Sequence, residues 1–464
     1  MQMRILLGGL LIFATSSTDG RVAAAAGAPA SVRTLTGTVD NVPFLADVPD
    51  PWNGTLLLWN HAYRQVPPPA EDCDPDHPEV KAWLLDHGYA LAGSEYPDFV
   101  WSAPELIHDQ LALLDWFTAE VGQPRHTVTW GRSLGGQMTA VLAERYPQRF
   151  SGALPMCGEI AGPAGFVNGL FDVGFALNTL LWPGSKVELV HIADPVANLT
   201  LAQSLLKNAL NSGSPQAKAR IALANALGDI PGWADSLAPL PADPDEQVLH
   251  QVLYDRFQDG TFVWGPGRGR MEQQLGGNPS WNIGIDYRRQ LATSSQRGLV
   301  ETEYQRAGLD LEADLATLNA APRIAPDPAA RNRLAAEGSI LGLVSVPTLT
   351  LHTTGDGVAP VENERQYGDL AALFGRSGDL RQTWVARANH CFFTGAEELT
   401  ALGVLFERIR TGSWSDARAA NLNAAAASFG QAYRQMFSFY ADGTSAVDSA
   451  FIDARPAPFL RPLP

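Results

Sequence analysis

The sequence has few cysteines and no common metal-binding or nucleotide-binding motif. Three cysteines among 464 residues exclude a scaffold held together mainly by disulfides. No C-x-x-C or H-E-x-x-H spacing occurs, so a zinc site has no support. A dinucleotide fingerprint and a phosphate-binding loop are also missing, and we expect no cofactor and no metal. The richest cluster of possible ligands, residues 71–77, is interrupted by prolines, which is more typical of a solvated loop.

Basic residues are in the minority. The chain has 33 Lys and Arg against 49 Asp and Glu, a net charge of −16 at pH 7. A field of this sign repels phosphate backbones, so we expect no nucleic-acid partner. A hydrophobic content of 45% with 18% charged residues is typical of a folded globular protein. The length fits one large α/β domain with an insertion, or two domains.

Long apolar runs are missing as well. The first residues, Met1 to Arg4, carry a positive charge, and an apolar run from Ile5 to Ala14 precedes small residues from Ala23 to Ala30. This pattern predicts a signal peptide within residues 1–30, with several A-x-A registers for its cleavage. The apolar run is too short to cross a bilayer, and no later run reaches about 18 residues. We therefore expect a secreted protein, extracellular or periplasmic, without stable membrane insertion.

Short β-branched runs alternate with helical patterns in two separate parts of the chain, which predicts parallel strands joined by crossover helices. Between them, residues 162–341 contain amphipathic helical stretches and little that resembles a strand. The simplest architecture is one sheet domain, residues 31–161 and 342–464, with a helical lid inserted at 162–341. Strands are expected at 32–39, 42–48, 54–60, 89–94, 126–130, 150–156, 347–354 and 381–385, and helices at 80–87, 104–121, 137–145, 360–374 and 397–409.

The pattern Gly131-Arg132-Ser133-Leu134-Gly135 lies between an expected strand and an expected helix. A serine on a sharp strand-to-helix turn takes a strained backbone conformation, and the flanking glycines let neighbouring elements approach closely. The N-terminus of the following helix directs N–H groups toward the place where an oxyanion forms. Ser133 is therefore a candidate nucleophile. A similar stretch at 375–379 follows a helix and has Asp379 in place of the second glycine, so we expect a loop there.

A serine hydroxyl needs a base to accept its proton, and that base needs a carboxylate to orient it. Asp356 follows the strand expected at 347–354, and His390 follows the strand expected at 381–385. The carboxyl ends of parallel strands meet at one edge of a sheet, which is also the edge that carries Ser133. The chain order Ser, Asp, His completes a nucleophilic triad.

With these residues in this order, the sequence resembles the α/β-hydrolase superfamily over residues 32–159 and 344–411. The resemblance implies an α/β fold with a mostly parallel, eight-stranded sheet and a large lid after the sixth strand. It also implies that Ser133 is the nucleophile, that His390 acts as general base and then acid, and that Asp356 orients His390.

The resemblance further implies an oxyanion hole formed by backbone N–H groups. Leu134, directly after the nucleophile, supplies one of them. The superfamily usually has His-Gly after the third strand, and here the matching stretch is His61-Ala62-Tyr63. The second N–H therefore comes from Ala62 or from Tyr63.

Other residues compete for these roles. Glu159, just past the strand at 150–156, could replace Asp356 as the acid, because some members of this fold use that position. His61 could be a structural hydrogen-bonding group or a proton donor. His352 lies inside an expected buried strand, from which it could not reach Ser133.

The cysteines allow several pairings. Cys391 follows His390, which is similar to feruloyl esterases and tannases, where that cysteine pairs with one beside the serine. Arg132 occupies the position before Ser133 here. Cys73 and Cys157 both follow strands that end at the catalytic edge, so either could bridge to Cys391, or all three could remain thiols.

The insertion is rich in aromatic residues, most of which should form its core, while some face the site. We therefore expect a small-molecule or peptide substrate with an apolar acyl or alcohol group. The sequence predicts a serine hydrolase that cleaves carboxylic esters through an acyl-enzyme. An acyltransferase is an alternative, as is a peptidase of the prolyl-oligopeptidase or tripeptidyl-aminopeptidase type. The peptidase would hold a substrate amine with lid acids, for which the candidates are Glu301, Glu303, Asp310 and Glu312.

Overall fold

The computed structural model describes residues 31–63, 75, 77–96, 103–257, 260–438 and 443–461. The predicted signal peptide, Cys73 and most of the cluster at 71–77 lie outside the described residues. Within the described part of the chain, no helix has the length and apolar character needed to cross a membrane.

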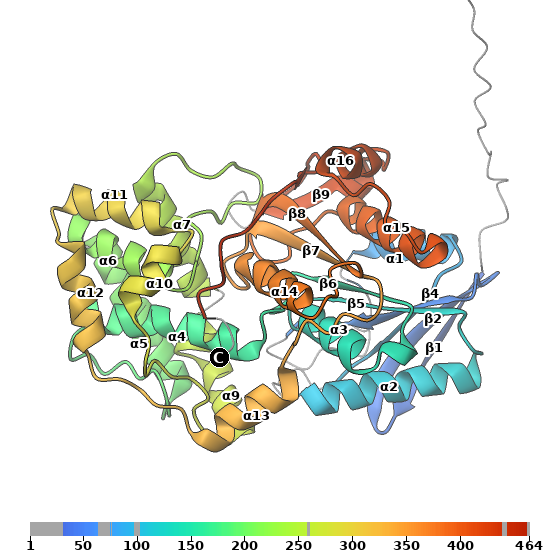
Figure 1. Ribbon diagram of the computed structural model, residues 1–464, viewed down its shortest axis with the longest axis horizontal. Helices are drawn as coiled ribbons and strands as arrows, with labels where there is room; N and C mark the ends of the chain where they lie inside the picture. The colour runs from blue at the N-terminus through green and yellow to red at the C-terminus, as the bar shows by residue number, and fades with distance from the viewer. Residues whose placement is uncertain are drawn as a thin grey trace, which may run out of the picture.

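A nine-stranded sheet organises one half of the molecule (Figure 1), in the order β1-β2-β4-β3-β5-β6-β7-β8-β11. Strands β4, β3, β5, β6, β7 and β8 run parallel, whereas β1, β2 and β11 pair antiparallel with their neighbours. The predicted fold class is confirmed by β1 to β8, and β11 adds a short ninth strand. The strands are β1 Ser31–Val39, β2 Val42–Asp50, β3 Thr55–Asn60, β4 Ala90–Ser94, β5 His126–Arg132, β6 Gly152–Met156, β7 Thr348–Gly355, β8 Leu380–Ala388 and β11 Phe451–Ile452.

The central strands are apolar on both faces because helices cover both sides of the sheet. Along β3, Leu56 and Leu58 join the core beneath α2 and α3, and Leu57 and Trp59 join the core beneath α1 and α15. Trp59 meets Trp130 of β5 edge to face, with ring centroids 4.7 Å apart. The helices around the sheet are α1 Pro78–Asp86, α2 Ala103–Glu120, α3 Leu134–Arg145, α14 Glu362–Leu373, α15 Gly395–Thr411 and α16 Ala419–Ala427.

The chain between β6 and β7 forms helices α4 to α13, which lie together beside the sheet half (Figure 1). They have a hydrophobic core of their own, built around Phe171, Phe175 and Trp264, as expected for most aromatic residues of this stretch. The division into domains and the role of these helices as a lid stay predictions. The helices are α4 Pro163–Leu180, α5 Pro195–Asn211, α6 Pro215–Ala226, α7 Pro244–Phe257, α8 Gly260–Val263, α9 Pro266–Leu275, α10 Tyr287–Thr293, α11 Arg297–Ala307, α12 Leu311–Ala320 and α13 Pro328–Gly338.

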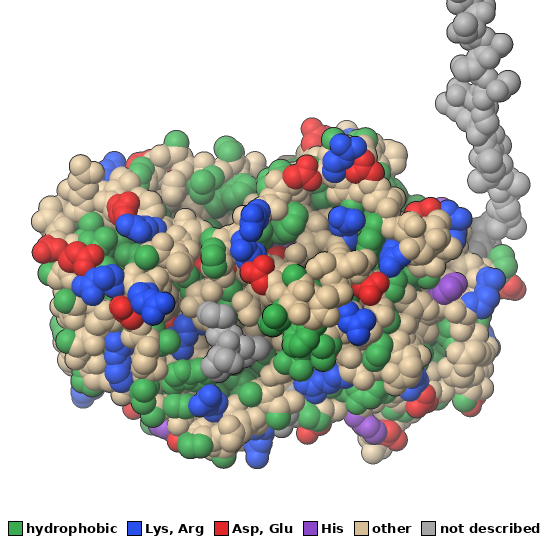
Figure 2. Space-filling model, in the orientation of Figure 1, with side chains coloured by type: hydrophobic (Ala, Val, Ile, Leu, Met, Phe, Trp, Pro, Cys, Tyr) green, Lys and Arg blue, Asp and Glu red, His purple; other side chains and the backbone are tan. Residues whose placement is uncertain are grey.

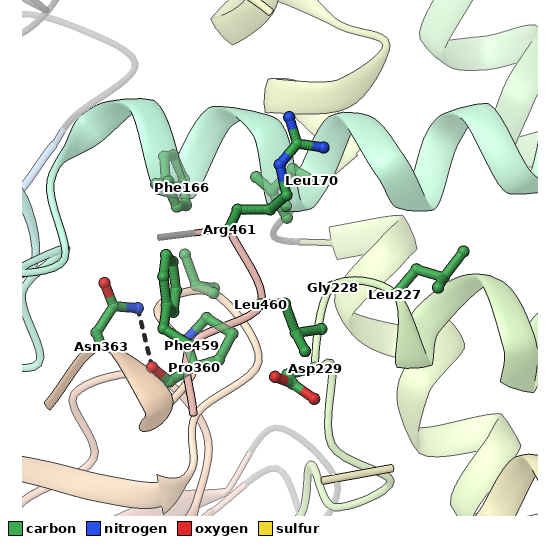
Figure 3. Close-up of a pocket in the computed structure, with 13 residues that line it drawn as sticks. Phe166, Leu170, Leu227, Gly228, Asp229, Pro360, Asn363, Phe459, Leu460 and Arg461 are labelled. Atoms are coloured by element: carbon green, nitrogen blue, oxygen red, sulfur yellow. Dashed lines mark hydrogen bonds between the residues drawn. The ribbon is translucent and has the colours of Figure 1, made fainter. Parts of the chain in front are cut away.

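The C-terminal segment joins the two halves. After a hairpin of β9 Gln435–Ser438 and β10 Gly443–Ala446 and the edge strand β11, the chain crosses to the inserted helices. Phe459 and Arg461 lie against α4 (Figure 3), and Arg461 forms a buried ion pair with Asp172 of that helix at 2.6 Å. The inserted helices are therefore held by the tail as well as by their two connections to the sheet.

Acidic, basic and apolar side chains are interspersed over the face shown in Figure 2. On that face no single sign of charge gathers over one element.

Candidate active site

Ser133 lies on the turn between β5 and α3 with φ 55° and ψ −125°, a conformation that L-residues rarely adopt. The two flanking glycines make this turn possible. A Cβ atom at Gly131 or at Gly135 would collide with the carbonyl oxygen of Asn60 on β3. Asn60 itself donates to Thr129 Oγ1 at 2.9 Å and to Thr139 Oγ1 at 2.8 Å, which ties β3 to β5 and α3 beneath the serine.

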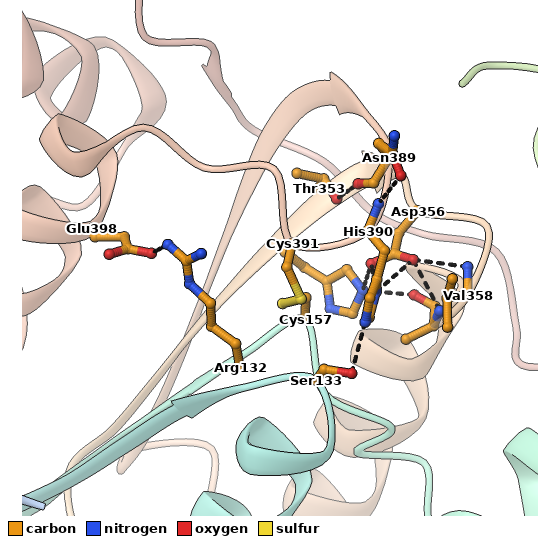
Figure 4. Close-up of a disulfide and its surroundings, with 12 residues drawn as sticks. Arg132, Ser133, Cys157, Thr353, Asp356, Val358, Asn389, His390, Cys391 and Glu398 are labelled. Carbon is orange, nitrogen blue, oxygen red and sulfur yellow. Dashed lines mark hydrogen bonds and ion pairs between the residues drawn. A yellow bond between two sulfur atoms is a disulfide. The ribbon is translucent and has the colours of Figure 1, made fainter. Parts of the chain in front are cut away.

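The three predicted triad residues meet at one edge of the sheet (Figure 4). The Nε2 atom of His390 lies 2.7 Å from Ser133 Oγ, and its Nδ1 atom lies 2.8 Å from Asp356 Oδ2. Ser133 is 9% exposed and Asp356 is 1% exposed, so the hydrogen bonds form in a largely dehydrated site. This is the geometry in which an imidazole can take the proton of a serine hydroxyl.

Asp356 is held in its ionised form. Its Oδ1 atom accepts the backbone N–H groups of Val358 and Ala359, each at 2.9 Å. Burial opposes the charge, but His390 and a hydrogen bond from His352 outweigh it, and the pKa of Asp356 lies below its ordinary value. A carboxylate that accepts several hydrogen bonds remains available to orient the imidazole.

Glu159, the alternative acid, lies at the same edge but in a different state. Within the described residues it makes no hydrogen bond to His390, and its Oε2 atom is buried without a hydrogen-bond partner. Burial raises the pKa of Glu159 to about 6, although the nearby His390 acts in the opposite direction. The structure therefore places Asp356, and not Glu159, in hydrogen-bond contact with the histidine.

The loop that carries His390 is fixed on both sides. Asn389 and Cys391 both have positive φ, 79° and 61°, so the histidine is presented on a tight turn. Cys391 forms a disulfide with Cys157 at the end of β6 (Figure 4), which selects one of the two pairings left open by the sequence. On the other side, Arg387 donates to the Phe392 carbonyl at 3.0 Å and pairs with Glu397 of α15.

Tyr254 of helix α7 also fixes the two loops of the triad. Its hydroxyl lies 2.7 Å from the Gly355 carbonyl, next to Asp356, and accepts the Asn389 N–H at 3.1 Å, next to His390. No feature of the sequence singled out this residue, because it lies more than 100 positions from both partners. Arg132 lies beside Ser133 but turns away to a buried ion pair with Glu398 (Figure 4).

The three residues expected at the oxyanion hole lie near the nucleophile turn. Leu134 is the first residue of α3, where backbone N–H groups have no partner within the helix. Ala62 and Tyr63 follow β3. Their loop is held by His61, which stacks on Tyr96 at 3.7 Å and accepts the Tyr96 hydroxyl on its carbonyl oxygen at 2.7 Å. These contacts give His61 a structural role in the loop.

Within the described residues, no group of three His, Cys, Asp or Glu side chains could hold a metal ion. The site described above is built from the hydrogen-bonded side chains of Ser133, His390 and Asp356. Its nucleophile turn after β5, carboxylate after β7 and histidine after β8 lie on a sheet whose first eight strands have the order β1-β2-β4-β3-β5-β6-β7-β8. The chain has the α/β-hydrolase fold.

Comparison with other proteins gives relatives of several activities. No protein-family profile matches this chain. It is 27% identical over 416 residues to an o-phthalyl amidase of Xanthobacter agilis, which covers 83% of this chain and 89% of the amidase.

Among solved structures, it is similar to the rice cell wall degrading esterase LipA of Xanthomonas oryzae, with a TM-score of 0.37, 14% identity and coverage of 77% and 84%. It is also similar to feruloyl esterase B of Aspergillus oryzae, with a TM-score of 0.36, 12% identity and coverage of 83% and 81%.

Proposed function

We propose that this α/β-hydrolase is a secreted serine hydrolase that cleaves carboxylic esters through a covalent acyl-enzyme. The observation that carries the proposal is the unbroken series of hydrogen bonds from Ser133 Oγ through His390 to Asp356. A triad of this kind activates a hydroxyl that is otherwise a weak nucleophile. Export is supported by the N-terminal sequence and by the disulfide, which is stable in an oxidising compartment.

In the proposed reaction, His390 Nε2 takes the Ser133 proton as Oγ attacks the substrate carbonyl carbon. Asp356 stabilises the resulting imidazolium. The N–H of Leu134 and an N–H of Ala62 or Tyr63 stabilise the oxyanion of the tetrahedral intermediate. His390 then protonates the leaving alcohol, and water, activated by the same histidine, releases the acid and restores the serine.

Aromatic side chains support an apolar acyl or alcohol group in the substrate. The ring of Tyr63, next to the oxyanion loop, meets that of Phe262 on α8 with centroids 5.1 Å apart. Phe262 in turn meets Phe166 of α4 at 5.8 Å. The inserted helices therefore bring aromatic surface to the loop that faces the nucleophile, which favours flat, apolar substrate groups.

Cleavage of amides of aromatic acids is the second candidate, supported by the similarity to the o-phthalyl amidase over most of both chains. The same triad and acyl-enzyme serve both reactions, because only the leaving group differs. The peptidase alternative has less support. Glu301, Glu303 and Glu312 form ion pairs with arginines, and Asp310 caps α12, so these acids have partners within the insertion.

The test uses Ser133→Ala and the matched control Ser377→Ala, whose serine is exposed in the loop with the similar sequence. On p-nitrophenyl esters we expect Ser133→Ala to lower kcat by about 10⁴-fold or more. Ser377→Ala should keep full activity and should still react with a fluorophosphonate probe. Comparison of p-nitrophenyl benzoate with benzoyl p-nitroanilide separates esters from amides, and added alcohol tests for acyl transfer. Equal activity of Ser133→Ala and the wild type would refute the proposal.

A further inference from the structure

His352 of β7 lies directly behind the carboxylate of the triad. It is fully buried. Its Nε2 atom is 2.7 Å from the Ala359 carbonyl oxygen and 3.6 Å from Asp356 Oδ2, and its Nδ1 atom is 3.1 Å from Glu364 Oε1. The sequence excluded this histidine as the catalytic base, and the structure shows that it contacts the acid instead.

The hydrogen bonds of His352 define its protonation. The Ala359 carbonyl can only accept, so Nε2 carries a proton. On the other side, Glu364 lies in the first turn of α14, where the helix dipole favours a carboxylate. Glu364 Oε2 also accepts the Thr350 hydroxyl at 2.6 Å, which stabilises the same charged form. An ionised Glu364 requires a proton on Nδ1 as well, and the ring is then an imidazolium.

The charges around His352 support this assignment. Asp356 and Glu364 flank it, and the carboxyl groups of Glu159 and Glu362 also act on it from the end of β6 and from α14. Burial alone would favour the neutral ring, but the hydrogen bonds to Asp356 and Glu364 outweigh it and raise the pKa of His352 to about 10. Within the described residues, the groups recorded in ion-pair range of Asp356 are His352 and His390.

We propose that His352 is a positioning residue, an imidazolium between Glu364 and Asp356 that fixes the Asp356 carboxylate and offsets part of its charge toward His390. Asp356 is then hydrogen-bonded or paired on both sides, by His390 in front and by His352 behind. The proposal rests on the proposed function, since it gives Asp356 its role in the triad. With His352 and Glu364 included, the series of contacts runs from Ser133 through His390, Asp356 and His352 to Glu364.

Electrostatics determines the direction in which loss of the His352 charge shifts the pH dependence of kcat/KM. A positive charge 3.6 Å behind Asp356 weakens the negative potential that His390 experiences. Without it, the full charge of Asp356 holds a proton on His390 more strongly. The low-pH limb of kcat/KM should then move to higher pH.

The first test requires no substrate. The side-chain nitrogens of ¹⁵N-histidine-labelled protein report the protonation of each ring, and the His352 signal is assigned by its loss in His352→Gln. We expect both ring nitrogens of His352 to stay protonated from pH 6 to pH 9. A neutral His352 at pH 8 would overturn the proposal. Because this measurement does not depend on turnover, it separates failure of this proposal from failure of the proposed function.

The second test is the pH profile of ester hydrolysis by His352→Gln, in which the amide can donate to the Ala359 carbonyl but carries no charge. We expect the low-pH limb of kcat/KM to move up by about half a unit to one unit. His250→Gln is the control, because His250 is also buried but has Glu246 and Asp235 as its charged neighbours. An equal fall of activity at every pH, with an unmoved limb, would indicate a merely structural role and overturn the proposal.

Discussion

At the scale of single residues, two buried carboxyl groups near one histidine differ in state because their neighbours differ. Asp356 accepts two backbone N–H groups and the ring of His390, and its pKa is lowered despite burial. Glu159 has a buried Oε2 atom without a hydrogen-bond partner, and burial raises its pKa to about 6. Hydrogen bonds, rather than proximity to His390 alone, distinguish the carboxylate that orients the histidine from the one that does not.

This difference predicts unequal effects of two isosteric substitutions. Asp356→Asn should lower kcat by about 10³- to 10⁴-fold, because the amide cannot stabilise the imidazolium and favours the wrong tautomer of His390. Glu159→Gln should change kcat by less than about tenfold at pH 8, because the Glu159 carboxyl of the wild type makes no hydrogen bond to His390. Steady-state kinetics on one ester measures both. Similar losses in the two variants would contradict this division of roles.

The sequence predicts the triad because each residue lies at a recognisable place, directly after a strand. Ser133 has the surrounding glycines, and Asp356 and His390 follow apolar strands in the expected order. His352 and Tyr254 carry no such signal. Their contacts with the triad depend on how the chain folds back at residues 356–360 and on where the insertion packs, and neither follows from local pattern.

At the scale of elements, the edge of the sheet is stabilised by parts of the chain that do not carry the triad. Helix α7 reaches the loops after β7 and β8 through one hydroxyl group, that of Tyr254. The disulfide joins the end of β6 to the loop after β8 across 234 residues of sequence. Loops are otherwise the most mobile parts of a fold, so these ties hold the catalytic geometry.

Tyr254→Phe tests the first of these ties. The substitution removes the hydroxyl contacts to both triad loops, and a net loss of about 1 kcal/mol per buried hydrogen bond should lower kcat by about fivefold or more. KM should stay nearly unchanged, because the triad loops move and the acyl pocket does not. Tyr304→Phe is the matched control, since its hydroxyl bonds to Asp314 at 2.9 Å within the insertion. That variant should keep its kcat. A rise in KM alone in Tyr254→Phe would instead indicate a substrate contact.

The disulfide predicts the state of the three cysteines. Alkylation of the denatured, unreduced protein should modify Cys73 only, as read by mass spectrometry of its peptides. Loss of the bridge in Cys157→Ala/Cys391→Ala should lower the free energy of unfolding by about 2 to 5 kcal/mol, because the bridge closes a long loop. Cys73→Ala is the control and should melt as the wild type does. A bridge that includes Cys73 would contradict the structure.

At the scale of the whole molecule, the sequence indicates two halves but not what joins them. The switch from strand and helix alternation to helices alone is visible from residue 162 onward, and the first inserted helix, α4, begins at Pro163. The C-terminal segment, however, carried no functional signal. Arg461 meets Asp172 across 289 positions, a pairing that periodicity and composition do not reveal.

The pairing of Arg461 with Asp172 can be tested by substitution. Asp172 is fully buried and accepts hydrogen bonds from Tyr287 at 3.0 Å and Gln290 at 2.9 Å, and the Arg461 guanidinium also donates to the Trp281 carbonyl at 2.7 Å. Burial raises the pKa of Asp172 even with the arginine present. Arg461→Met leaves this carboxylate without its counterion, which should cost about 3 to 5 kcal/mol of folding free energy at pH 8.

The loss in Arg461→Met should shrink as the pH falls, because an acid with a raised folded-state pKa stabilises the fold when protonated and loses that contribution as the pH rises. Thermal unfolding at pH 5 and pH 8 measures the difference. Asp172→Asn/Arg461→Met removes both charges and should recover most of the stability. Arg455→Met, at an exposed arginine of the same tail, should change it by less than about 0.5 kcal/mol. If Arg461→Met melts as the wild type does at pH 8, the tail does not hold the inserted helices in solution.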